Sequence, residues 1–101
     1  MLPTPYVLLD LETTGAHPER DRIIEVALTR VTDSASPAER WETLINPEVP
    51  IPPVIERLVG ISSAMVAEAP TFAEIAETLR AFLADAVLVA HNVRFLSLIH
   101  I

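Results

Sequence analysis

The sequence contains no cysteine and only two glycines among its 101 residues. Without cysteine, disulfides, zinc–thiolate sites and a cysteine nucleophile are excluded. With so little glycine, neither of the glycine-rich phosphate loops is present, and nucleotide binding of the Rossmann or P-loop kind is not expected. Lysine is also absent: the seven basic residues are all arginine, against 14 acidic ones, and the net charge is -7. So acidic a chain is not expected to bind a phosphate backbone by its own charge, and any nucleic-acid contact would need bound divalent metal.

Long apolar runs are missing as well. The longest, Ala86 to Ala90, is far too short to cross a membrane. No basic region precedes an apolar stretch near the start, as it would in a signal peptide. We therefore expect a cytoplasmic protein with no membrane partner. Half of the residues are apolar and 21% are charged, which is typical of one small globular domain with a modest core.

Three segments in the first half have the pattern of β-strands. Tyr6 to Glu12 is apolar at nearly every position on both of its faces, which predicts a central strand covered on both sides. Ile23 to Val31 and Trp41 to Ile45 follow after polar turns, and Asn46-Pro47 ends the third segment. Consecutive strands joined by short turns predict a three-strand antiparallel meander.

The second half predicts helices and one more strand. Pro52-Pro53 opens a short predicted helix from Val54 to Val59, with Gly60 as its C-terminal cap. Thr71 and Glu74 form a capping box ahead of a longer amphipathic helix. Residues 87–90 read as a fourth strand. The predicted class is therefore α/β: an antiparallel meander, a helical crossover and a further parallel strand, with at least one more helix needed to close the domain.

Asp10 and Glu12 are the first candidates for chemistry. In a strand they lie on one face, about 7 Å apart along the chain. They stand at the carboxyl end of the strand, where open α/β sheets place their sites. Two like charges this close repel each other, and a divalent cation removes that penalty. Oxygen ligands suit Mg²⁺ or Mn²⁺. For Asp-x-Glu alone, the alternative is a pair of solvated carboxylates at a strand end.

The motif Asp10-Leu11-Glu12-Thr13-Thr14-Gly15, followed by Ile23-Ile24-Glu25-Val26, resembles the first motif of the DEDD-type 3'-5' exonuclease family. Within that family it is similar to the epsilon proofreading subunit of bacterial DNA polymerase III. The resemblance implies a ribonuclease H-like exonuclease fold. It also implies that Asp10 and Glu12 are catalytic ligands of two divalent metal ions, Mg or Mn. By the same resemblance, Thr13, Thr14 and Gly15 bind the 3'-terminal nucleotide.

Two later segments extend the resemblance. The stretch from Leu58 to Ser62 is similar to a family segment near the terminal base, which implies that Gly60 and Ile61 bind substrate. The structural alternative is a helix cap and a core residue. The stretch His91-Asn92-Val93-Arg94-Phe95 resembles the opening of the second motif. That resemblance implies that His91, Asn92 and Phe95 shape the nucleotide site, although a lone histidine after a buried strand is otherwise a structural residue.

The end of the chain departs from the family pattern. Leu96 stands where the family has a metal-binding aspartate. The third motif, which in the histidine subgroup supplies the general base and the last aspartate ligand, is absent. His100 is no substitute, because no aspartate follows it. Residues 96–101 resemble a translation of the transposon end used in tagmentation sequencing libraries. We therefore predict that residues 1–95 are the N-terminal part of an exonuclease domain and 96–101 a non-native tail; the alternative is the start of an apolar helix.

The resemblance thus implies a histidine-subgroup 3'-5' exonuclease of the proofreading type, acting on the single-stranded 3' end of DNA. A DNA polymerase catalytic subunit is a candidate partner. Two alternatives stay open: an RNA-directed exonuclease similar to an oligoribonuclease, and a non-catalytic interaction module that keeps the fold. The chain as it stands has two of the four carboxylates and no base, so we expect little or no nuclease activity from it.

Overall fold

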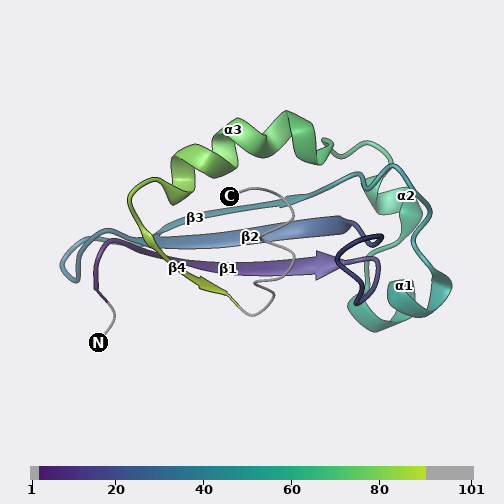
Figure 1. Ribbon diagram of the computed structural model, residues 1–101, viewed down its shortest axis with the longest axis horizontal. Coiled ribbons are helices and arrows are strands. Elements are labelled where there is room, and N and C mark those ends of the chain that lie inside the picture. Colours follow the sequence, from purple (N-terminus) through teal and green to yellow (C-terminus); the bar gives the residue numbers. More distant parts are fainter. Residues whose placement is uncertain (1–2, 91–101) are drawn as a thin grey trace.

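Three of the four strands follow one another along the chain. β1 (Tyr6–Thr13), β2 (Ile23–Val31) and β3 (Glu39–Leu44) pair antiparallel. β4 (Val87–Ala90) pairs parallel with β1, and the strand order is β3-β2-β1-β4. The arrangement is that of a computed structural model, which describes residues 3–90 (Figure 1). It confirms the predicted meander with a further parallel strand, although the third strand begins and ends slightly earlier than expected.

The crossover helix α3 (Phe72–Leu83) lies along one face of the sheet (Figure 1). Its start has the predicted capping box: the Glu74 amide donates to the Thr71 hydroxyl at 3.3 Å, and the Thr71 amide donates to the Glu74 carboxylate at 2.9 Å. Alternate residues of β1 and β2 point toward the helix, and each buried aliphatic side chain contributes roughly 1.5–3 kcal/mol. This main core consists of Val7, Leu9, Leu11, Ile23, Val26, Leu28, Ile45, Ile75 and Leu79.

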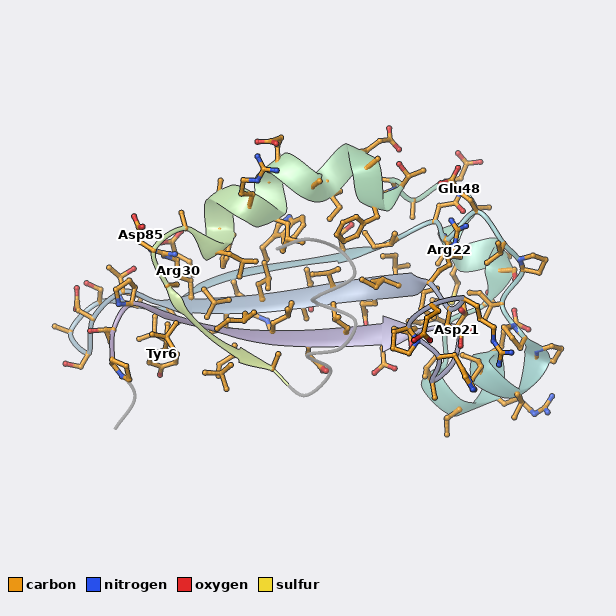
Figure 2. The ribbon with its side chains drawn as sticks, in the orientation of Figure 1. Tyr6, Asp21, Arg22, Arg30, Glu48 and Asp85 are labelled. Carbon is orange, nitrogen blue, oxygen red and sulfur yellow. The ribbon has the colours of Figure 1, made fainter. Side chains whose placement is uncertain are left out.

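The carboxyl end of α3 is held to the sheet by Arg30 of β2. The Arg30 guanidinium donates to the carbonyls of Phe82 and Ala84 at 2.8 and 3.0 Å. Figure 2 shows Arg30 beside the turn that leads from α3 into β4, near Asp85. A cation at this end of a helix satisfies free carbonyls and complements the helix dipole. The contact therefore helps to set where the crossover ends and β4 begins.

Two short helices lie beyond the carboxyl end of β1 (Figure 1). They are α1 (Pro53–Val59) and α2 (Ser63–Val66). Gly60 caps α1 in the left-handed region, at φ 78°, as predicted. A second core joins this pair of helices to the start of β2 and comprises Ile24, Ile51, Ile61 and Val66. Because Ile24 anchors it, α1 is held close to the point where β1 ends.

The face of β1 opposite α3 carries Leu8 and Asp10, and Leu8 is 42% exposed. No helix among residues 3–90 lies over this face (Figure 1). Among the described residues the single long helix covers only the opposite face, so the expected cover of this second face of β1 stays a prediction. The consequence for function is that this face of β1 is open to solvent. Within residues 3–90, no helix combines the length and apolar character needed to cross a membrane.

Candidate active site

The two predicted metal ligands lie on the open face of β1. Val7, Leu9 and Leu11 point into the main core, so strand alternation turns Asp10 and Glu12 to the other side. Asp10 is exposed and Glu12 is partly buried. Both stand near the carboxyl end of the strand, just before the loop to β2. The predicted pair is thus accessible and shares one face.

Glu25 adds a third carboxylate beside this pair. In the β1–β2 register Glu25 lies directly opposite Glu12. Partial burial, and then the negative charges of Glu12, Glu42 and Asp10, raise the pKa of the Glu25 carboxyl above its ordinary value of 4.5. Like charges directly opposite each other destabilise a sheet. The open face therefore concentrates negative charge that a bound cation would relieve.

This donor set fits a hard divalent ion. Asp10 and Glu12 offer only oxygen atoms, the ligands that Mg²⁺ and Mn²⁺ prefer. No three His, Cys, Asp or Glu side chains among residues 3–90 are grouped so that they could hold an ion by themselves. Mg²⁺ usually keeps several waters and binds through one or two carboxylates together with substrate phosphates. The pair therefore suits a part of the protein side of such a site.

The loop after β1 is tightly hydrogen-bonded. The Thr13 hydroxyl donates to the Gly15 carbonyl at 2.7 Å. Thr14 is only 5% exposed, and its hydroxyl donates to an Asp21 carboxylate oxygen at 3.0 Å while accepting from the Arg22 amide at 2.9 Å. The Thr14 amide also donates to the Arg22 carbonyl at 2.8 Å. The Thr14 hydroxyl is therefore already engaged inside the loop.

A hollow of about 340 Å³ opens between this loop and α1. One wall consists of Glu12, Thr13 and Gly15, and the opposite wall is apolar. The apolar wall contains Leu58, which is 78% exposed. Its other members are Ile55 and Val59. A carboxylate predicted to bind metal, two residues of the predicted nucleotide turn and an apolar surface thus meet in one place.

Gly60 and Ile61, the predicted substrate contacts of this segment, lie elsewhere. Ile61 is 5% exposed and packs in the second core, and Gly60 caps α1; neither lines the hollow. Both residues therefore have the structural roles of a helix cap and a core residue, and their contact with substrate, which those roles allow, stays a prediction. The segment reaches the hollow through α1 instead, and sequence reasoning missed this because a partly apolar short helix gives no sign of which side stays exposed.

Asp10 borders a second open hollow, of about 620 Å³, farther along the same face. Arg40 of β3 also lines it and donates to the Thr29 hydroxyl at 3.2 Å.

A third hollow, of about 530 Å³, lies between the β1–β2 loop and the start of α3, and contains none of the predicted site residues. The predicted contacts His91, Asn92 and Phe95 lie outside the described residues.

Asp21 is a residue of the β1–β2 loop that the sequence did not mark as a candidate site residue. It lies in the β1–β2 loop (Figure 2) and accepts hydrogen bonds from the Thr14 hydroxyl and, at 2.9 Å, from the His17 amide. Burial raises the pKa of the Asp21 carboxyl, but these two hydrogen bonds and the charges of Arg20 and His17 outweigh it, so that pKa lies below the ordinary value of 3.8. An aspartate in a polar loop gave no separate signal in the sequence.

The sequence is similar to those of known nucleases. Residues 7–97 match the family described as Exonuclease, of the RNase T type. The DNA polymerase III subunit epsilon-like protein of Rhodobacter capsulatus is 42% identical over 92 residues, covering 89% of this chain and 13% of that protein. The 3'-5' exonuclease DinG of Bacillus subtilis is 41% identical over 91 residues, covering 89% and 10%. The chain thus spans a small part of these relatives.

Solved structures have the same fold. Exonuclease X in complex with 5' overhanging duplex DNA superposes with a TM-score of 0.69 at 28% identity, over 89% of this chain and 50% of that one. Exonuclease I superposes with a TM-score of 0.76 at 21% identity, over 93% and 23%. The sheet and its crossover helix therefore have the ribonuclease H-like exonuclease fold, and the chain belongs to the exonuclease family.

Proposed function

We propose that this chain supplies the first half of the active site of a metal-dependent 3'-5' exonuclease that removes nucleotides from single-stranded 3' ends of DNA, in the manner of a proofreading enzyme. The observation that carries the proposal is the position of Asp10 and Glu12 on the open face of β1, beside the loop and the apolar hollow. The names of the relatives, DNA polymerase III epsilon-like protein and 3'-5' exonuclease DinG, support the same activity.

Each part of the site has a task in this reaction. Asp10 and Glu12 would hold the divalent ions. The chemistry that Mg²⁺ or Mn²⁺ would supply when bound is activation of the attacking water and stabilisation of the leaving oxygen. Thr13 and Gly15 form one side of the terminal nucleotide's position, and the apolar wall that contains Leu58 receives the base. Because the chain carries a net charge of -7, phosphate binding depends on those ions.

DNA is the proposed substrate because the relatives' names and the complex of exonuclease X refer to DNA. A polymerase partner has support from the same names, among them the PolC-type DNA polymerase III of Caldanaerobacter subterraneus. The 101-residue chain itself is proposed to be inactive, since Leu96 replaces the aspartate that the family's second motif supplies. Discrimination between DNA and RNA depends on contacts to the 2'-hydroxyl of the sugar, so the test below includes an RNA substrate.

The test is a hybrid protein in which residues 1–95 replace the matching part of the Rhodobacter capsulatus relative's exonuclease domain. We expect this hybrid to shorten a 5'-labelled single-stranded DNA from its 3' end with Mg²⁺ or Mn²⁺. Asp10→Asn or Glu12→Gln is expected to reduce the rate at least 100-fold, the order of effect seen when transition-state charge stabilisation is lost.

The matched control is Glu77→Gln, which removes an exposed carboxylate of α3 far from the open face. It should leave the rate within about twofold of the hybrid's, as an exposed ion pair contributes little. A folded hybrid that does not degrade DNA, or that degrades it equally well without Asp10, would refute the proposal. Faster degradation of RNA than of DNA would support the RNA-directed alternative.

A further inference from the structure

The Asp21 carboxylate connects the beginning of the β1–β2 loop to its end. It accepts from the Thr14 hydroxyl at 3.0 Å and from the His17 amide at 2.9 Å. The backbone of the next residue, Arg22, makes two hydrogen bonds with Thr14: its carbonyl accepts from the Thr14 amide, and its amide donates to the Thr14 hydroxyl. The Asp21 side chain is 13% exposed and lies 3.8 Å from the Arg20 guanidinium. One carboxylate therefore organises the turn that follows Glu12.

Gly15 lies directly against this carboxylate. A Cβ added to Gly15 would stand 2.5 to 2.9 Å from three atoms, all of them in the Asp21 carboxyl group. Gly60 is the glycine with positive φ, so Gly15 is not required by a left-handed backbone. It is required by space, because hydrogen bonds hold the neighbouring carboxylate in place. The glycine of the turn and Asp21 thus form one interlocked unit.

The residues of the turn point in two directions: some line the hollow, and one points to Asp21. Thr13 and Gly15 line the hollow shared with Glu12 and α1, whereas the Thr14 hydroxyl points to Asp21 and is buried. A change at Asp21 would therefore reach the hollow through Thr14 and Gly15 and not by direct contact. We propose that Asp21 is a positioning residue, which holds the Thr13–Gly15 turn in the conformation that receives the 3'-terminal nucleotide. This inference rests on the proposed function.

The experiment measures binding of thymidine 5'-monophosphate to the 101-residue chain in the presence of Mg²⁺. Amide shifts of the isotopically labelled chain report the Kd, and Mg²⁺ is titrated alone in parallel. Asp21→Asn keeps the size of the side chain but places an amide donor opposite another donor. We expect it to weaken nucleotide binding about tenfold, the effect of losing one hydrogen bond to a charged group. The Mg²⁺ affinity should stay within about twofold, because Asp21 does not contact the ion.

Asp33 provides a matched control. It accepts from the amides of Ala35 and Ser36, both at 2.8 Å, in the β2–β3 turn. That turn lies at the opposite end of the sheet from α1 (Figure 1). Asp33→Asn disturbs a similar turn, and we expect no change in nucleotide binding. If both variants weaken nucleotide binding equally, Asp21 acts only through general stability and the positioning role is wrong.

A second pair of variants covers the case in which Asp21→Asn does not fold. Thr14→Val removes the hydroxyl that donates a hydrogen bond to Asp21, and Thr14→Ser retains that hydroxyl. We expect the valine variant to bind the nucleotide at least fivefold more weakly than the serine variant. Equal affinities would overturn the inference. If the unaltered chain binds no nucleotide, the Thr13–Gly15 turn does not receive one and the inference fails, whereas the proposed function is judged by the activity of the hybrid; if the chain binds and Asp21→Asn binds equally well, only the positioning role fails.

Discussion

Glu12 of β1 and Glu25 of β2 are directly paired neighbours on adjacent strands, and both side chains lie on the open face of the sheet. Two carboxylates in this position repel, and no hydrogen bond or ion pair of the described residues joins either to a cation. Glu25→Gln should therefore raise the free energy of unfolding at neutral pH by roughly 0.2–1 kcal/mol in metal-free buffer. Urea denaturation measures the change.

The same substitution has a metal-dependent signature. At saturating Mg²⁺ the ion already offsets the repulsion, so the gain from Glu25→Gln should shrink. Glu68→Gln is the control, since it removes an exposed carboxylate outside the sheet. A Glu25→Gln variant that is less stable than the unaltered chain would show that Glu25 has a stabilising partner.

Gly15 and Asp21 should be strongly coupled in stability. Gly15→Ala places a methyl group against the Asp21 carboxylate, and overpacking of this kind costs about 1–3 kcal/mol. In an Asp21→Ala background the clashing atoms are gone, so the same alanine should cost much less. A double-mutant cycle measures this coupling. Additive effects would mean that Gly15 is required for another reason.

Acid should weaken the fold through Asp21. The pKa of its carboxyl in the folded chain lies below the ordinary value of 3.8, so the ionised form stabilises the folded state. That contribution is complete above the pKa of the unfolded chain and is lost as the pH falls through the folded-state pKa. Asp21→Asn should therefore flatten the dependence of the urea midpoint on pH below about pH 4. An unchanged slope would contradict the hydrogen-bonding account.

Leu58 and Ile61 should separate binding from stability. Leu58 is exposed at the hollow, so Leu58→Ala should weaken thymidine 5'-monophosphate binding about 3- to 10-fold through lost apolar contact, with little effect on unfolding. Ile61 is buried, so Ile61→Val should lower the free energy of unfolding by about 0.5–1.5 kcal/mol without affecting nucleotide binding. If Ile61→Val weakens nucleotide binding as much as Leu58→Ala, the original prediction for Ile61 is right.

The elements with local chemical signals could be predicted from the sequence. The capping box of Thr71 and Glu74 marks the start of α3, and Gly60 marks the end of α1. Strand alternation placed Asp10 and Glu12 on one face. These predictions succeed because each depends on residues within one or two turns of chain, whose effects do not require the rest of the fold.

Contacts between residues far apart in the sequence could not be predicted. The β1–β2 register shifts between Glu12 and Thr13, so spacing alone does not place Glu25 opposite Glu12. The contact of Gly15 with Asp21 arises from the path of the loop. The apolar pattern of β1 predicted that Leu8 would be buried. Its exposure depends on which face of the sheet the crossover helix packs against, and that helix packs against the opposite face.

Metal binding by the unaltered 101-residue chain tests the central claim most directly. Mn²⁺ broadens the amide signals of nearby residues, and substoichiometric additions should first broaden those from Asp10 to Thr13 and that of Glu25. Asp10→Asn with Glu12→Gln should abolish the effect, while Glu77→Gln should not change it. Broadening centred on α3, or broadening at β1 that survives loss of both carboxylates, would contradict a metal site on the open face of β1.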